Sequence, residues 1–238
     1  MILGVIPARG GSKGLPGKNL RLVAGVPLIV HTIRAARKSR LLSDFIVSTD
    51  DPAIAQVARA EGAKVPFLRP PDLAEDDVSI WPVVRHAVAE WERGGEGEEA
   101  AEAVALLQAT SPLRTAVDID ACIARFLELD AGICVTVFAA HDSPYFNMVE
   151  ITAESAPYAR PCSPAMLKSL RRQEAPCVYV LNGAVYVVRR SVLATLQNQF
   201  EVDRFALSEM PRERSVDVDS AEDLAFAEWL LSRAERGA

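Results

Sequence analysis

The first twenty residues constrain the fold most strongly. Residues 2–6 form an uninterrupted apolar run, which is typical of a buried strand, and a glycine-rich segment follows directly. Glycines permit backbone conformations that turn N–H groups toward an anion, and the same segment holds three cations: Arg9, Lys13 and Lys18. A strand that opens into a cationic glycine loop predicts a polyphosphate site at the carboxyl edge of an α/β sheet.

Two common phosphate-binding motifs do not fit this loop. The P-loop pattern requires a hydroxyl residue after Lys18, where this chain has Asn19, and no register gives Gly-x-Gly-x-x-Gly. The alternative of a merely solvated turn is disfavoured, because apolar segments at residues 2–6 and 26–30 lie on both sides of the loop.

Strand and helix patterns alternate through the first 140 residues. Helical spacing of apolar residues predicts helices over residues 27–40, 52–62, 79–91 and 117–129. Apolar runs predict strands over residues 45–49, 63–67, 103–107 and 133–138. We therefore predict a three-layer α/β fold, with a mainly parallel sheet and helices on both faces, in a single catalytic domain spanning residues 1–238.

Composition excludes several classes of partner. The formal net charge is −6 and no basic run is present, so we expect no nucleic-acid surface. No apolar stretch has the length of a membrane span or a signal peptide, so we expect a cytoplasmic enzyme. The four cysteines show no metal-binding spacing and are expected to be reduced thiols.

Residues 6–20, Ile-Pro-Ala-Arg-Gly-Gly-Ser-Lys-Gly-Leu-Pro-Gly-Lys-Asn-Leu, resemble the signature of the acylneuraminate cytidylyltransferases, or CMP-sialic acid synthetases. The resemblance implies that this loop wraps the triphosphate of CTP. It assigns nucleotide binding to Ala8, Arg9, Gly10, Ser12, Lys18 and Asn19. The related Kdo cytidylyltransferases carry Tyr and a Ser-Thr-Arg run where this chain has residues 10–13, which disfavours that branch.

Two further segments resemble the same family. Arg69 and Ser79 match an Arg-Pro loop and a helix-initiating serine that approach the cytosine, although an exposed surface loop is the alternative. Residues 108–114, Gln-Ala-Thr-Ser-Pro-Leu-Arg, resemble the motif Gln-Pro-Thr-Ser-Pro-Leu-Arg. This match assigns nucleotide or sugar contacts to Gln108 and sugar contacts to Ser111 and Arg114, with Ala109 replacing the usual proline.

Residues 140–187 depart from the strand–helix repeat. Strands are predicted near residues 145–151 and 177–188, separated by proline-rich loops, and the segment resembles the sugar-binding and dimer-forming part of the family. Arg171 and Arg172 suit an acidic sugar, because a guanidinium pairs in a bidentate manner with a carboxylate; a solvated arginine pair is equally open. We predict a homodimer formed through this small β-rich insertion.

A pair of aspartates near the C-terminus predicts a metal site. Asp217 and Asp219 flank Val218, so alternation places both carboxylates on one face, where oxygen ligands suit Mg²⁺. Helix capping is the alternative role. The family's Asp-x-Asp metal motif falls here and favours magnesium.

These patterns predict an enzyme that transfers CMP from CTP to the anomeric hydroxyl of an acidic nine-carbon sugar. The resemblance ranks N-acetylneuraminic acid or a close bacterial analogue first as acceptor. The predicted catalytic residues are Arg9, Lys18, Asp217 and Asp219, with no general base assigned. The alternatives are a nucleotidyltransferase of the same fold acting on Kdo or a sugar 1-phosphate, and a non-catalytic nucleotide-binding module.

Overall fold

The computed structural model describes residues 1–12, 14–95, 100–168 and 171–236. Lys13, one of the three predicted loop cations, lies outside these residues, as does the side chain of Arg172. The chain forms two compact units. Unit 1 comprises Met1–Val137 with Asn182–Ala238, and unit 2 comprises Phe138–Leu181.

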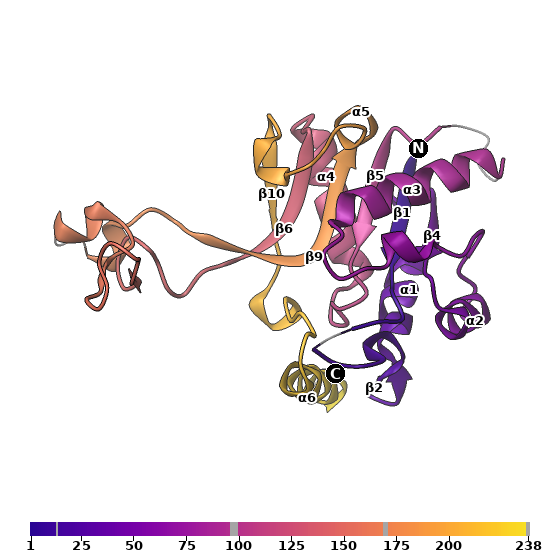
Figure 1. The fold of residues 1–238 in the computed structure, drawn as a ribbon, viewed down its shortest axis with the longest axis horizontal. Helices are drawn as coiled ribbons and strands as arrows, with labels where there is room; N and C mark the ends of the chain where they lie inside the picture. The colour runs from indigo at the N-terminus through magenta and orange to yellow at the C-terminus, as the bar shows by residue number, and fades with distance from the viewer. Residues whose placement is uncertain (13, 96–99, 169–170, 237–238) are drawn as a thin grey trace. The chain divides into compact units, whose positions relative to one another are not determined.

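Unit 1 is built on a six-stranded sheet (Figure 1) with the order β10-β6-β9-β5-β1-β4. Its strands are β1 (Ile2–Pro7), β4 (Asp44–Ser48), β5 (Ala103–Leu107), β6 (Ile133–Ala139), β9 (Tyr179–Arg189) and β10 (Phe205–Glu209). Strand β1 runs parallel to both β4 and β5, and β10 runs parallel to β6. Strand β9 is antiparallel to β5. The predicted mainly parallel sheet is therefore confirmed.

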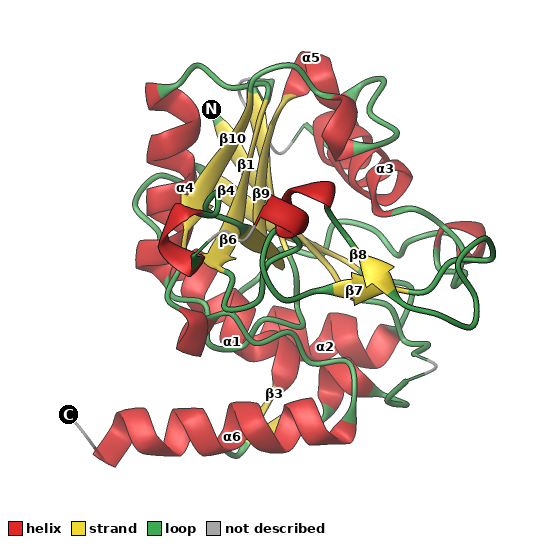
Figure 2. Ribbon diagram, turned by 90° about the vertical axis from the view of Figure 1, so that its left-hand side faces the viewer, coloured by secondary structure: helices red, strands yellow, loops and turns green. Residues whose placement is uncertain are grey.

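Helices cover both faces of this sheet, with α4 on one side and α3 and α5 on the other (Figure 2). The helices are α1 (Leu28–Lys38), α2 (Pro52–Ala60), α3 (Ile80–Arg93), α4 (Ala116–Glu128), α5 (Arg190–Leu193) and α6 (Ala221–Arg236). Every residue of β1 is buried because the strand has neighbours at both edges and helices on both faces. No helix within the described residues is long and apolar enough to cross a membrane.

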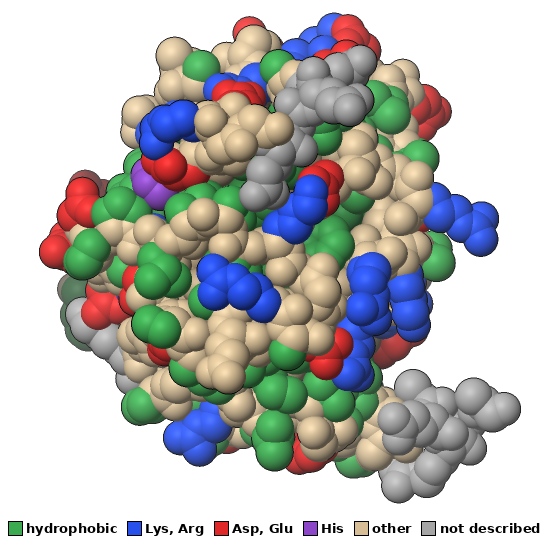
Figure 3. All heavy atoms as spheres, turned by 90° about the vertical axis from the view of Figure 1, so that its right-hand side faces the viewer, with side chains coloured by type: hydrophobic (Ala, Val, Ile, Leu, Met, Phe, Trp, Pro, Cys, Tyr) green, Lys and Arg blue, Asp and Glu red, His purple; other side chains and the backbone are tan. Residues whose placement is uncertain are grey.

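Short elements complete the two units. The 3₁₀ turns are η1 (Lys18–Leu20), η2 (Pro71–Leu73), η3 (Pro164–Lys168), η4 (Arg172–Glu174), η5 (Gln199–Glu201) and η6 (Arg212–Arg214). Strands β2 (Leu22–Val23) and β3 (Val26–Pro27) form a hairpin in unit 1, and β7 (Val149–Glu150) pairs with β8 (Arg160–Pro161) in unit 2. On the face drawn in Figure 3, acidic and basic side chains are interspersed with apolar ones.

Several predicted strands are wrong in extent. Residues 63–67 provide only one bridge, between Ile46 and Lys64, because prolines at 66 and 70 limit further pairing. The strand predicted over residues 145–151 is reduced to the two residues of β7. The predicted insertion of residues 140–187 corresponds to unit 2, except that residues 182–187 belong to β9 in the central sheet.

Candidate active site

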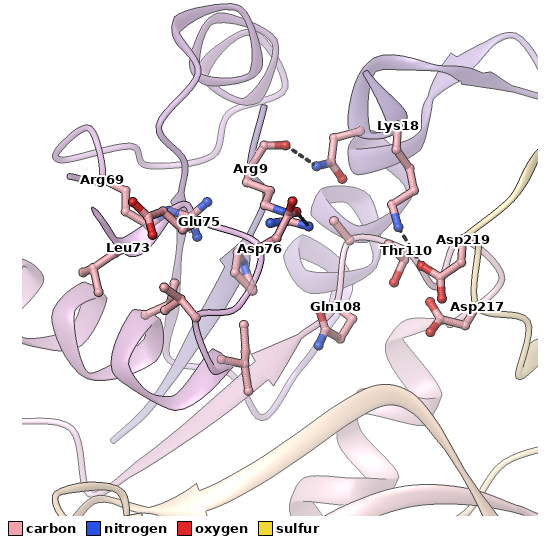
Figure 4. Close-up of a pocket in the computed structure, with 16 residues that line it drawn as sticks. Arg9, Lys18, Arg69, Leu73, Glu75, Asp76, Gln108, Thr110, Asp217 and Asp219 are labelled. Carbon is pink, nitrogen blue, oxygen red and sulfur yellow. Dashed lines mark hydrogen bonds and ion pairs between the residues drawn. The ribbon is translucent and has the colours of Figure 1, made fainter. Parts of the chain in front are cut away.

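A cavity of about 300 Å³ opens in unit 1, where β1 and β5 end (Figure 4). Polar side chains reach it from the glycine loop, from the segment before α3, from the end of β5 and from the segment before α6. The predicted site residues that line it are Arg9, Lys18, Asn19, Arg69, Gln108, Asp217 and Asp219. Residues more than 200 positions apart in the sequence thus meet in one pocket.

The glycine loop is fixed from both ends. The buried Asn19 donates a hydrogen bond from Nδ2 to the carbonyl oxygen of Arg9 at 2.9 Å, which closes the loop on itself. A side chain at Gly14 would place its Cβ 2.6 Å from the carbonyl oxygen of Asp219. Only glycine therefore permits this approach, which brings Lys18 Nζ within 2.7 Å of Asp219 Oδ1.

Arg69 lies in the pocket wall rather than on an exposed loop. It is 5% exposed, and its Nη2 donates to Asp50 Oδ1 at 3.1 Å. Burial lowers the pKa of its guanidinium, and the hydrogen bond to Asp50 acts against that shift. The Gly10 N–H also donates to Asp50 Oδ1, at 3.2 Å, so one carboxylate joins the glycine loop to the arginine.

Arg9 makes the shortest ion pair of the pocket. Its Nη2 lies 2.6 Å from Asp76 Oδ1, and its Nη1 lies 3.5 Å from the carbonyl oxygen of Ala74. Both acceptors belong to the segment between η2 and α3. Figure 4 shows the guanidinium of Arg9 and the carboxylate of Asp76 side by side in the middle of the pocket.

The two predicted metal ligands share the pocket wall. Val218 between them is fully buried, and its N–H donates to the carbonyl oxygen of Thr110 at 2.9 Å, so alternation turns Asp217 and Asp219 outward. Burial raises the pKa of Asp217, a hydrogen bond with the Thr110 side chain opposes this, and the charge of Asp219 raises it further. Two adjacent carboxylates of this kind favour a bound cation.

These oxygens fit a magnesium ion that takes its remaining ligands from phosphate and water. Mg²⁺ is commonly held by one or two carboxylates together with substrate phosphates. Within the described residues, no group of three or more His, Cys, Asp or Glu side chains is arranged to hold a metal ion. The aspartate pair offers two carboxylates of the kind that holds Mg²⁺ together with phosphate and water.

A buried polar network lies beneath this pair. Thr136 Oγ1 donates to Asn182 Oδ1 at 2.7 Å, and Asn182 Nδ2 donates to Ser215 Oγ at 2.9 Å. Ser215 lies two residues before Asp217, so β6 and β9 together position the segment that carries the carboxylates. The turn η6 is anchored as well, because Arg214 makes a bidentate pair with the buried Asp118 of α4, at 3.0 and 2.7 Å.

The remaining predicted residues lie away from the pocket wall. Ser111 and Arg114 are buried, at 1% and 2% exposure, and Arg114 Nη1 donates to the carbonyl oxygens of Gln108 and Ala184 at 3.0 and 2.7 Å. Burial lowers the pKa of Arg114 to about 9. Through these two bonds the arginine supports the strand end that carries Gln108.

The other predicted site residues belong partly to unit 1 and partly to unit 2. Ala8 is buried, Ser79 is the N-cap residue of α3, and the described pocket wall includes neither of them, nor Gly10 or Ser12. Arg171 is exposed in unit 2.

Sequence reasoning missed the apolar part of the pocket and two of its carboxylates, Glu75 and Asp76. Leu73, Val78, Ile80 and Val83 line the pocket together with Asp76 and Thr110. Their position in the sequence could have indicated them, because Val78 and Ile80 flank Ser79, a predicted site residue at the beginning of α3. An apolar wall beside a buried arginine suits a flat heterocycle that carries polar edges.

Comparison with known proteins decides the family. The model of a cytidylyltransferase family matches residues 3–233 of the chain. The chain belongs to this cytidylyltransferase family. It is 33% identical to CMP-N,N'-diacetyllegionaminic acid synthase of Campylobacter jejuni, over 97% of this chain and 95% of that protein.

Other relatives of this cytidylyltransferase show the same likeness. It is 31% identical to N-acylneuraminate cytidylyltransferase of Streptococcus agalactiae, over 92% of this chain but only 50% of that longer protein. A solved structure of CMP:2-keto-3-deoxy-manno-octonic acid synthetase complexed with CTP superimposes with a TM-score of 0.70. The match covers 98% of this chain and 99% of that chain at 22% identity, and it confirms the fold.

Proposed function

We propose that this cytidylyltransferase transfers CMP from CTP to the anomeric hydroxyl of a nonulosonic acid and releases pyrophosphate. The observation that carries the proposal is the convergence of Arg9 and Lys18 with Asp217 and Asp219 in one pocket. Nucleotidyl transfer requires this combination of cations for a polyphosphate and carboxylates for a metal. The names of the two sequence relatives supply the nucleotide and the acceptor class.

The proposed roles follow from position in the pocket. Arg9 and Lys18 bind the phosphates and stabilise the charge that develops on the leaving pyrophosphate. The pyrimidine ring lies against the apolar wall near Arg69, whose buried guanidinium supplies hydrogen-bond donors. Gln108, at the end of β5, faces the same cavity and contacts nucleotide or sugar.

We propose Mg²⁺ as the metal, held by Asp217 and Asp219. When bound, the ion neutralises phosphate charge and lowers the pKa of the attacking hydroxyl. The pair of Lys18 with Asp219 keeps one carboxylate oriented toward the phosphate site. Attack by the sugar hydroxyl on the α-phosphorus forms one P–O bond, breaks the bond to pyrophosphate and releases the hydroxyl proton to solvent.

We propose N-acetylneuraminic acid or a bacterial analogue such as a legionaminic acid as the acceptor. The relatives named for these sugars align along most of this chain. The shared feature of these acceptors is a carboxylate, and Arg171 and Arg172 of unit 2 suit it chemically.

We also propose that unit 2 forms a homodimer with a second copy. None of its described residues is fully buried, yet Ile151, Tyr158 and Leu167 are 63%, 78% and 78% exposed. Apolar surface left uncovered in a small unit favours association.

Pyrophosphate release tests the proposed reaction. Purified protein is incubated with CTP, Mg²⁺ and one of three acids: N-acetylneuraminic acid, a diacetyllegionaminic acid or Kdo. We expect release with at least one nine-carbon acid and much less with Kdo. Binding of CTP without turnover on any acid would instead support a non-catalytic nucleotide-binding module. Preferential turnover of Kdo would indicate a Kdo cytidylyltransferase.

A further inference from the structure

Each of the three cations that line the described pocket is paired with a carboxylate. The pairs are Arg9–Asp76, Lys18–Asp219 and Arg69–Asp50, with N–O distances of 2.6, 2.7 and 3.1 Å. Phosphate oxygens and carboxylate oxygens seek the same guanidinium and ammonium donors. A polyphosphate that binds here must therefore share these donors with the carboxylates or displace them.

Two of these carboxylates have a further structural or chemical role. Asp50 also accepts the Gly10 N–H at 3.2 Å and so holds the glycine loop. Asp219 stands beside Asp217 in the proposed magnesium site. Asp76 lines the same pocket and pairs with Arg9 at 2.6 Å, so its carboxylate and a bound polyphosphate would compete for one guanidinium.

The position of Asp76 allows its negative charge to affect the binding of a polyphosphate in the pocket. Its carboxylate lines the same cavity as Arg9, Lys18 and Asp217, and Figure 4 places it between Arg69 on one side and Lys18 on the other. Its side chain is 34% exposed and that of Arg9 is 33% exposed, so the pair is only partly screened by water. A polyphosphate in this cavity meets a negative charge at the cation that should bind it.

We propose that Asp76 sets nucleotide affinity by competing with the polyphosphate for Arg9. This inference rests on the proposed function. A triphosphate or pyrophosphate must displace the carboxylate from the guanidinium in order to bind Arg9, whereas CMP lacks the β- and γ-phosphates, so the pair weakens polyphosphate binding more than CMP binding. After transfer, Asp76 returns to Arg9 and weakens the hold on pyrophosphate, which assists its release.

Isothermal titration of CTP, pyrophosphate and CMP into full-length protein with Mg²⁺ tests this role. Asp76→Asn keeps the shape of the side chain and removes its charge. We expect the Kd values for CTP and pyrophosphate to fall about three- to tenfold, as for a partly exposed ion pair, with a smaller change for CMP. Asp76→Glu, which retains the charge, should bind CTP with nearly the original affinity.

The neighbouring Asp77 supplies a matched control, because it is exposed and lies outside the described pocket wall. Asp77→Asn removes the same charge one residue away and should shift the CTP affinity less than Asp76→Asn does. Unchanged or weaker CTP binding in Asp76→Asn would overturn the inference, because Asp76 would then orient Arg9 for the nucleotide. Failure of the unmodified protein to bind CTP would instead count against the proposed function itself.

Discussion

Units 1 and 2 differ in what holds them together. Unit 1 buries both faces of its sheet, and large side chains such as Trp81, Trp91 and Ile33 are almost fully excluded from water. Unit 2 has a two-stranded ribbon and, among its described residues, no side chain that is fully buried. The pocket of the candidate active site lies wholly within the well-packed unit, which can hold ligating groups in fixed positions.

This difference in packing leads us to propose that the two units have different functions. In our proposal, nucleotide and metal binding depend on unit 1, because every residue that lines the pocket belongs to it. In our proposal, acceptor binding and dimer formation depend on unit 2, whose exposed apolar side chains favour association with another surface. Each of the following substitutions separates these two sets of properties.

The largest expected effect is loss of transfer in Asp217→Ala and Asp219→Ala. Removing a metal ligand removes charge stabilisation at the reacting phosphate, and we expect kcat to fall at least about a thousandfold. The measurement is steady-state pyrophosphate release at several Mg²⁺ concentrations. Glu222→Gln, a nearby charge change in the first turn of α6, is the control and should retain normal turnover.

The second effect is on the stability of unit 1. Asp118 is 4% exposed and accepts two hydrogen bonds from Arg214, so Asp118→Asn should lower the free energy of unfolding by about 3 kcal/mol. Urea unfolding measures this change. Glu128→Gln on the same helix breaks only an exposed pair with Arg125 and should cost less than about 1 kcal/mol.

The same carboxylate predicts a pH dependence. Burial acts to raise the pKa of Asp118, but hydrogen bonds from Arg214 and Thr115 outweigh it and leave the pKa below its ordinary value. A carboxyl with a depressed folded-state pKa contributes stability above its unfolded-state pKa and loses it as pH falls through the folded-state value. Stability of the unmodified protein should therefore decline below about pH 4 more steeply than that of Asp118→Asn.

A third effect concerns association through unit 2. Ile151→Ser removes an apolar side chain that is 63% exposed, and we expect the dimer Kd to rise about tenfold or more. Light scattering over a concentration series measures it. Val117→Ser changes a side chain that is 71% exposed in unit 1 and should leave the mass unchanged. A monomeric unmodified protein at micromolar concentration would contradict the dimer.

The smallest effect expected is on acceptor affinity. If an arginine of unit 2 pairs with the sugar carboxylate, Arg171→Ala or Arg172→Ala should raise the acceptor KM about tenfold, because a hydrogen bond to a charged group contributes on the order of 2 kcal/mol. The KM for CTP should stay unchanged. Unaltered acceptor KM values in both variants would remove these arginines from the site.

The sequence was most informative where burial was complete. Strands β1, β5 and β6 were predicted within a residue or two because helices cover both faces of the sheet and leave continuous apolar runs. Strand β10 was missed, because it lies at the sheet edge, pairs only with β6 and alternates buried with exposed residues. The antiparallel place of β9 depends on long-range pairing that no local pattern encodes.

The site shows a similar limit. Residues in continuous motifs, such as Arg9, Lys18 and Asp219, could be assigned from sequence, and the structure places them together. The assignment of Arg114 to the sugar rested on its motif, while its burial depends on carbonyl oxygens supplied by both β5 and β9. Asp76 carried no motif signal, and the role that we propose for it is argued from its ion pair with Arg9.

The most direct test of the division between the two units is titration of CTP with Mg²⁺, in the absence of acceptor, into three full-length proteins. These are the unmodified protein, Arg171→Ala and Asp217→Ala. We predict that Arg171→Ala binds CTP with the unmodified Kd, within about twofold, whereas Asp217→Ala loses the Mg²⁺ dependence of binding. Equal weakening of CTP binding in Arg171→Ala and Asp217→Ala would contradict a nucleotide site completed by unit 1 alone.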